Sequence, residues 1–255
     1  MDAAPVLGAA FFVSTSERGR SGSLRRPYSV VAQGVWVGFL EDWDLSYNEI
    51  NELLTANPSL RSFVMGYAAE IKCRNMYFND KPDITDIYKP DDHDRVEKGD
   101  WVMTYKGERL AVEVKSIQTN SLKPKKSGKI SPTYQCDASD RRLVTFSDGS
   151  TLDTTALLVG EFDVLALNIH SFTGEWNFVF AKNADLPTME GSTRGAAKKY
   201  TPLQQRQLIK TLIPIDFEPD PSIYSYNPFM IMDSVLEDRK HGVDPSLEKV
   251  KIEDD

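Results

Sequence analysis

The segment from residue 99 to residue 115 constrains the fold more than any other, because it reads as two short strands joined by a tight turn at Lys106-Gly107. The register set by a two-residue turn places Asp100 directly opposite Glu113. Cβ atoms of directly opposed residues in an antiparallel pair lie about 4.5–5.5 Å apart. Lys115 lies two residues beyond Glu113 and therefore on the same face of the strand. We expect two carboxylates and one ammonium group to converge at one end of this hairpin.

Two interpretations of this convergence remain open at this point. Like charges that face each other directly destabilise a sheet, and a bound divalent cation would compensate for the repulsion. The alternative is a solvated hairpin at the edge of a sheet, with all three charged groups in water. The segment 110–114 is mostly apolar and β-branched, which suits a central strand better than an exposed edge.

An Asp followed about a dozen residues later by Glu-x-Lys resembles the core motif of the PD-(D/E)xK nuclease superfamily, which includes many restriction endonucleases. The matching residues here are Asp100 and Glu113-Val114-Lys115, and Gly99 stands where that superfamily often has Pro. Three stretches look like those of uncharacterised restriction-endonuclease-like proteins: 57–70, 98–118 and 160–187. The resemblance covers roughly residues 57–215.

The resemblance implies an α/β fold with a restriction-endonuclease-like core, in which helices flank a central mixed β-sheet. It also implies a Mg²⁺-dependent endonuclease, with Mn²⁺ able to substitute, that hydrolyses phosphodiester bonds of DNA in restriction or phage defence. Asp100 and Glu113 would hold the metal, and Lys115 would orient or activate the attacking water and stabilise the transition state. RNA stays open as a substrate, and a homodimer is compatible with the resemblance.

Two other functions are alternatives to a DNA endonuclease. Members of the superfamily sometimes lose catalysis and persist as nucleic-acid-binding or assembly modules with the same fold. A metal-dependent hydrolase of small phosphoesters is a further alternative, against which the basic segments of the chain argue weakly.

A helix predicted from Asn57 onward carries a further candidate, Glu70. Six apolar residues of this helix follow the 3.6-residue period and predict a buried stripe: Leu60, Phe63, Val64, Tyr67, Ala68 and Ile71. Glu70 lies at the edge of this stripe, where a charge is costly to bury unless it is paired or bound to metal. Glu70 therefore either completes the metal site or forms a surface ion pair with Arg74.

The segment after the motif is basic. Gln118 is a candidate for contact with the nucleic-acid backbone, although a loop or helix-cap role is an equal alternative. Four lysines are candidates for a phosphate clamp: Lys123, Lys125, Lys126 and Lys129. A net charge of −8 argues mildly against a nucleic-acid partner, but the local distribution of charge matters more. The alternative for the lysines is a solvated loop.

The organisation of the 255-residue chain is predicted in three parts. Residues 1–56 form an N-terminal arm with an accessory strand and helix, residues 57–218 form the nuclease-like core, and residues 219–255 form an extended C-terminal tail. Residues 79–98 read as a solvated acidic loop. No apolar run approaches the length of a membrane span. The two cysteines, Cys73 and Cys136, suit a reducing cytoplasm and argue against a zinc site.

Overall fold

A computed structural model describes residues 38–90, 98–193, 195–243 and 251–253. Packing divides the chain into two compact units, residues 1–51 and residues 52–255. The first unit contains helix α1 (Phe39–Asp42) and the start of α2 (Tyr47–Ala56). The α2 helix begins with a capping box, because Ser46 Oγ accepts from the Glu49 N–H and Glu49 Oε2 accepts from the Ser46 N–H. The predicted accessory strand before residue 38 lies outside the described residues.

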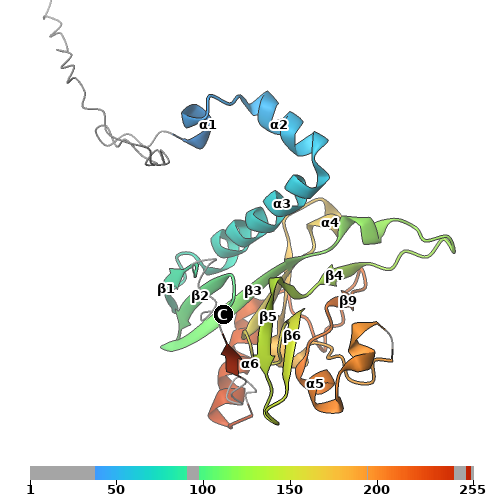
Figure 1. The fold of residues 1–255 in the computed structure, drawn as a ribbon. Helices are drawn as coiled ribbons and strands as arrows, with labels where there is room; N and C mark the ends of the chain where they lie inside the picture. The colour runs from blue at the N-terminus through green and yellow to red at the C-terminus, as the bar shows by residue number, and fades with distance from the viewer. Residues whose placement is uncertain (1–37, 91–97, 194, 244–250, 254–255) are drawn as a thin grey trace, which may run out of the picture. The chain divides into compact units, whose positions relative to one another are not determined.

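A five-stranded mixed sheet forms the centre of the second unit (Figure 1). Its strands, in spatial order, are β1 (Ile84–Tyr88), β2 (Trp101–Tyr105), β3 (Glu108–Ser116), β7 (Val164–Asn168) and β8 (Phe178–Lys182). The β3–β7 pair is parallel and the other three pairs are antiparallel. Every residue of β7 is buried, as are residues 110–114 of β3, so the apolar strands of the sequence are the central strands of the sheet.

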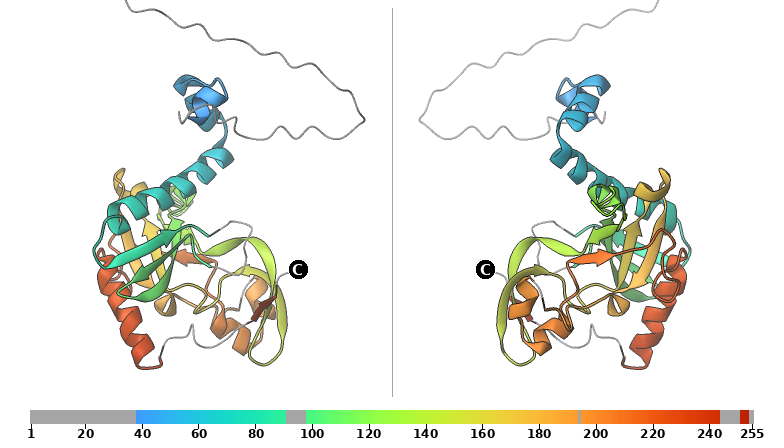
Figure 2. Two further views of the ribbon diagram at one scale, coloured as in Figure 1. Left: turned by 90° about the vertical axis from the view of Figure 1, so that its left-hand side faces the viewer. Right: turned by 90° about the vertical axis from the view of Figure 1, so that its right-hand side faces the viewer.

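Helices cover one face of the central sheet and smaller sheets cover the other (Figure 2). The helical layer consists of α3 (Pro58–Cys73), continued by a π-helical turn (Arg74–Phe78), and α6 (Pro228–Lys240). Ala69 and Cys73 of α3 and Met232 of α6 pack with Val112 and Val164 of the sheet. The opposite face packs against the two-stranded sheet of β4 (Thr133–Gln135) and β9 (Leu212–Pro214). These observations show an α/β fold with a mixed central sheet and flanking helices.

A three-stranded sheet in the order β10-β5-β6 completes the described strands. Its members are β5 (Asp137–Thr145), β6 (Thr151–Ala156) and β10 (Lys251–Glu253). The β5–β6 hairpin turns at Gly149, whose φ is 79°. The remaining helical segments are η2 (Thr119–Leu122), α4 (His170–Thr173), η3 (Asn183–Asp185), η4 (Ala196–Lys199) and α5 (Pro202–Gln207). None of the described helices is both long and apolar enough to cross a membrane.

Two expectations about local structure are wrong. The segment 219–255 is not simply an extended tail, because α6 buries Met232, Val235 and Leu236 in the core beneath the sheet. The Pro- and Asp-rich composition of this segment does not indicate a helix, but α6 begins after the cap residue Asn227 with Pro228 in its first turn. The acidic segment 79–98 also contains a strand, β1, which pairs with β2.

Candidate functional site

The β2–β3 hairpin has the predicted turn and register. Lys106 and Gly107 both have positive φ, 50° and 85°, as a two-residue hairpin turn of the favoured twist requires. Pairing runs from Tyr105 opposite Glu108 to Trp101 opposite Val112. The residues that this hairpin positions at its open end are those of the candidate site.

Asp100 immediately precedes β2 and lies just beyond the last residue pair of the hairpin, Trp101 opposite Val112. Its N–H donates to Val112 O at 2.9 Å, and its Oδ2 accepts from the Val114 N–H at 2.6 Å. The pairing therefore does not continue to Asp100 opposite Glu113 as expected. The Val114 N–H of β3 therefore donates to the carboxylate of Asp100, where a continued ladder would offer a backbone oxygen.

Gly99 is required by this geometry. Its φ is +91°, and a Cβ built on it would lie 3.1 Å from Val112 O. Proline, with φ fixed near −65°, does not fit this conformation. The departure from the superfamily pattern at this position thus has a local structural reason.

Glu113 and Lys115 lie on one face of β3, opposite to the face that packs against α3. Lys115 Nζ is 2.6 Å from Glu113 Oε1, and the two side chains are 20% and 12% exposed. Glu113 Oε2 and Asp100 Oδ1 accept no hydrogen bond from any residue that the structure describes. Among the described residues, the contacts of this pair thus involve one oxygen of each carboxylate, Asp100 Oδ2 and Glu113 Oε1.

The charges of this group perturb one another. Burial raises the pKa of the Asp100 carboxyl well above its usual value, and Glu113 adds to the rise while Lys115 opposes it. Burial disfavours the charged form of Lys115, but the Glu113 and Asp100 carboxylates outweigh burial and raise the pKa of the ammonium above its usual value. The ammonium of Lys115 therefore lies beside an Asp100 carboxyl whose ionised form is disfavoured.

Glu70 approaches the group from α3. Its backbone oxygen accepts from Trp101 Nε1 at 3.0 Å, which fastens the helix to β2 next to Asp100. Its carboxylate contributes to the raised pKa of Asp100. Glu70 Oε2 is 2.7 Å from Lys89 Nζ. The alternative partner Arg74 lies over the Trp101 ring instead, 4.6 Å from its centroid.

The apolar stripe of α3 is oriented differently from the prediction. Ala69, Glu70 and Cys73 are the buried residues of the helix. Five large apolar residues are 40–68% exposed: Leu60, Phe63, Val64, Tyr67 and Ile71. The predicted buried stripe was wrong because the helix packs on the sheet through small side chains, which allow close approach but carry a weaker hydrophobic signal.

The structure places Gln118 and the four lysines between β3 and β4. Gln118 Nε2 donates to Gln135 Oε1 at 2.9 Å, and Gln118 Oε1 accepts from Thr133 Oγ1 at 3.4 Å, so this side chain joins the loop to β4. The lysines follow in a segment that projects from the sheets (Figure 1). Lys123, Lys125, Lys126 and Lys129 are exposed, and none forms an ion pair with a described residue.

Glu161 is a neighbouring acidic group that the sequence interpretation missed. It forms a buried ion pair with Arg142, and its Oε2 also accepts from the Leu158 N–H at 2.8 Å. Burial raises the pKa of Glu161 against the lowering effect of Arg142, and Glu113 contributes to the rise. The Nε and Nη1 of Arg142 are buried without a hydrogen-bond partner among the described residues. The sequence around Glu161 gives no sign of its contact with Arg142 of β5, because the two residues are 19 positions apart.

The acidic groups offer hard oxygen ligands of the kind that Mg²⁺ prefers. Within the described ranges, however, no group of three or more His, Cys, Asp or Glu side chains is placed to hold a metal ion. Mg²⁺ is usually bound by one or two carboxylates together with water and substrate phosphates. Asp100 and Glu113 supply two carboxylates, which is the number that this smaller requirement asks for.

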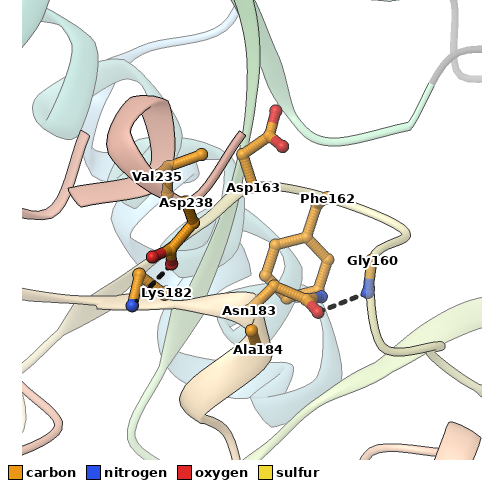
Figure 3. A pocket seen from close by; sticks show the side chains of 8 residues that line it. All are labelled: Gly160, Phe162, Asp163, Lys182, Asn183, Ala184, Val235 and Asp238. Carbon is orange, nitrogen blue, oxygen red and sulfur yellow. Dashed lines mark hydrogen bonds and ion pairs between the residues drawn. The ribbon is translucent and has the colours of Figure 1, made fainter. Parts of the chain in front are cut away.

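A small pocket lies at the start of β7 and the end of β8 (Figure 3). Lys182 in its wall is 2.8 Å from Asp238 and 3.6 Å from Asp185. Asp163 accepts from the Ala111 N–H at 2.7 Å and from Arg239 at 2.6 Å. The charged groups of the pocket are thus satisfied by the protein itself, and we assign the pocket no ligand.

Comparisons of the chain with protein-family models, with curated proteins and with solved structures find no match. Any functional assignment therefore depends on the residues and geometry described above.

Proposed function

We propose that this protein is a metal-dependent nuclease that hydrolyses phosphodiester bonds of DNA, with its site at the end of the β2–β3 hairpin. One observation carries the proposal: Asp100, Glu113 and Lys115 converge at the end of a buried central strand, where their charges are expensive to keep. Residues with strongly perturbed pKa values and a specific charged partner are candidates for function. A role in restriction or phage defence is the biological setting that the sequence resemblance suggests.

The carboxylates of Asp100 and Glu113 would hold Mg²⁺, or Mn²⁺ in its place, and Glu70 would support them directly or through water. When bound, the metal supplies Lewis-acid stabilisation of phosphoryl charge and acidifies a water molecule. Asp100 Oδ1 and Glu113 Oε2, which accept no hydrogen bond from a described residue, are the protein groups that support this assignment. Burial and the Glu113 carboxylate both disfavour the ionised form of Asp100. A bound cation would stabilise that ionised form.

Lys115 would stabilise negative charge on the reacting phosphate. An ammonium group has no lone pair and cannot be a metal ligand. Its ion pair with Glu113 holds the long side chain at the site, because the Nζ–Oε1 distance is 2.6 Å. A fixed positive charge of this kind acts mainly in the transition state, where phosphoryl charge develops.

A second function, a catalytically inactive nucleic-acid-binding or assembly module, has its own supporting observations. The Glu113 carboxylate already has Lys115 as a charged partner, and Glu70 has Lys89. These ion pairs would also suit a purely structural cluster. The two functions differ in what a divalent cation does to the protein.

The deciding experiment combines metal binding with cleavage. Purified protein is incubated with plasmid, single-stranded DNA and RNA, each with Mg²⁺, Mn²⁺ or chelator, and its melting temperature is measured under the same conditions. We expect metal-dependent DNA cleavage and a metal-dependent rise in melting temperature. Both should vanish in Asp100→Ala and persist in Glu108→Ala, a matched change at the exposed end of β3.

The nuclease assignment is abandoned if the parental protein binds nucleic acid equally well in chelator and cleaves none of the three substrates. Cleavage of RNA alone would retain the chemistry and change the substrate. A metal-dependent rise in melting temperature that survives Asp100→Ala would show that the cation binds elsewhere.

A further inference from the structure

An aromatic pair lies at the surface of the second unit, where α4 meets the segment that follows β9. The ring centroids of Phe172 and Phe217 are 4.7 Å apart, and the ring planes are tilted by 39°. Phe172 is partly buried and packs against the apolar cluster on the sheet face opposite to α3. Phe217 is 53% exposed. Single exposed apolar side chains are ordinary on a protein surface, so the location of this ring matters more than its exposure.

The exposed ring lies where the basic segment between β3 and β4 joins β4. Strand β9 pairs with β4, and one hydrogen bond extends this pairing, from the Ile215 N–H to Pro132 O at 3.0 Å (Figure 1). Phe217 follows Ile215 by two residues, and Lys129 precedes Pro132 by three. The aromatic pair is therefore close to the lysines Lys123, Lys125, Lys126 and Lys129, which are exposed and form no ion pair with a described residue.

The aromatic pair is also next to the end of β3 that carries Lys115. Ser116 follows Lys115 and pairs with Asn168 at the end of β7. Helix α4 begins two residues after Asn168 and contains Phe172. The apolar cluster under Phe172 includes Ile117, which lies two residues after Lys115. The candidate site, the lysines and the aromatic pair thus share one face and one end of the central sheet.

An exposed aromatic ring beside a basic segment is the combination that binds single-stranded nucleic acid. Lysines attract the phosphate backbone, and the ring stacks on a base of any sequence. The bases of a duplex already stack on one another and offer no free face. Asp216 and Glu218 are exposed on either side of Phe217 and would repel a phosphate there. The contact expected at Phe217 is therefore with a base and not with the backbone.

We propose that Phe217, supported by Phe172, is a stacking platform for an unpaired base of single-stranded DNA, whose backbone follows the lysines of the basic segment. The inference rests on the proposed function for the choice of DNA, and it adds a preference for a single strand over a duplex. A strand held in this way passes the end of β3, where Lys115 is placed to contact a phosphate.

The test measures binding of the full chain by fluorescence anisotropy in chelator, so that no strand is cleaved. The probes are a labelled single strand of DNA, its duplex, and an abasic strand of the same length and charge. The parental protein should bind the single strand more tightly than the duplex or the abasic strand. Phe217→Ala should weaken binding of the single strand by about 10-fold, the order of the loss of one stacked base. Binding of the abasic strand and the salt dependence should stay the same, because no phosphate contact is lost.

Three further variants separate stacking from a structural role of the ring. Phe217→Leu keeps an apolar side chain without an aromatic face and should lose affinity as Phe217→Ala does. Phe217→Trp should bind at least as tightly as the parent, and its added emission should be quenched by the single strand and not by the abasic strand. Phe63→Ala is the matched control, because Phe63 is 68% exposed on α3, which packs on the other face of the sheet. It should bind all three probes like the parent.

Two results would overturn the stacking platform. One is a parental protein that binds the abasic strand as tightly as the strand with bases. The other is a Phe217→Ala variant that loses the same affinity for both strands, or for neither. An RNA strand that binds more tightly than DNA of the same sequence would overturn the choice of DNA. Because these measurements need neither metal nor cleavage, a protein that cleaves nothing but shows the Phe217 dependence would lose the nuclease assignment and keep the platform.

Discussion

At the scale of single residues, the candidate site is a balance between one ammonium and several carboxylates. Lys115 Nζ lies 2.6 Å from Glu113 Oε1, and its charge also lowers the pKa of the Asp100 carboxyl. Removing the ammonium therefore affects both carboxylates, and removing a carboxylate affects the ammonium. The two signs nevertheless have different expected roles. That difference makes the site testable one residue at a time.

The Lys115→Ala variant is expected to keep or tighten Mg²⁺ binding, because a nearby positive charge is gone and no ligand has been lost. Cleavage should fall by about 10²-fold or more, since a preorganised charge acts in the transition state. Asp100→Ala should lose metal and activity together. Titration calorimetry and single-turnover cleavage on the same preparations separate these effects, and parental cleavage rates in Lys115→Ala would contradict a catalytic role.

The raised pKa of Asp100 predicts how stability and metal affinity depend on pH. In metal-free protein the folded state holds its proton to higher pH than the unfolded chain, so the contribution of Asp100 to stability is lost as pH rises from about 3.9 through the folded pKa. Asp100→Asn should therefore flatten the decline in melting temperature across that window in chelator. Metal affinity of the parental protein should rise over the same window. Parallel curves for parent and variant would contradict the prediction.

At the scale of elements, the hairpin could be predicted because its determinants are local. The Lys106-Gly107 turn and the alternation of side chains fix the β2–β3 register without reference to the rest of the chain. The position of the Asp100 side chain could not be predicted from the turn alone, because its hydrogen bond from the Val114 N–H depends on where the β2–β3 pairing stops. The orientation of α3 and the Glu161–Arg142 pair depend on contacts distant in sequence, and neither could be predicted from periodicity.

Two glycines of the hairpin should respond differently to alanine. Gly107 and Gly99 have similar φ values, 85° and 91°, but a Cβ on Gly107 meets nothing within 4 Å while one on Gly99 meets Val112 O at 3.1 Å. Gly107→Ala should cost about 1 kcal/mol of unfolding free energy from backbone strain alone. Gly99→Ala should cost roughly 1–3 kcal/mol and also weaken metal binding, because it displaces Asp100. Urea unfolding measures the unfolding free energy of the two variants, and calorimetry measures their metal affinity. Equal losses in both variants would contradict the prediction.

The basic segment between β3 and β4 should bind phosphates without reading sequence. Replacing Lys123, Lys125, Lys126 and Lys129 with Ala should weaken binding equally for unrelated DNA sequences. The slope of log affinity against log salt should fall by roughly 0.9 for each lost phosphate contact. Lys198→Ala with Lys199→Ala serves as the control, since both lysines are exposed on η4. An unchanged slope in the quadruple variant would show that the segment is a solvated loop that makes no phosphate contact.

At the scale of the whole molecule, the C-terminal part of the chain completes the core that supports the site. Helix α6 lies on the same face of the sheet as α3, and Val112 and Val114 of β3 belong to the apolar cluster that both helices cover. Tyr105 Oη donates to Asp233 Oδ1 at 2.9 Å, and Arg239 Nη1 donates to Arg109 O at 2.8 Å. The strand that carries Glu113 and Lys115 is therefore supported by residues far away in sequence.

Two methionines of α6 test this support. Met232 is fully buried and Met230 is 63% exposed on the same helix. Met232→Ala should lower the unfolding free energy by about 2–5 kcal/mol, because it leaves a cavity in the core, whereas Met230→Ala should change it by less than about 0.5 kcal/mol. If α6 and the central sheet unfold as one unit, the loss appears as a single shifted transition by both circular dichroism and tryptophan fluorescence, since Trp101 lies in β2. Two separate transitions in Met232→Ala would show that α6 detaches while the sheet and its hairpin stay folded.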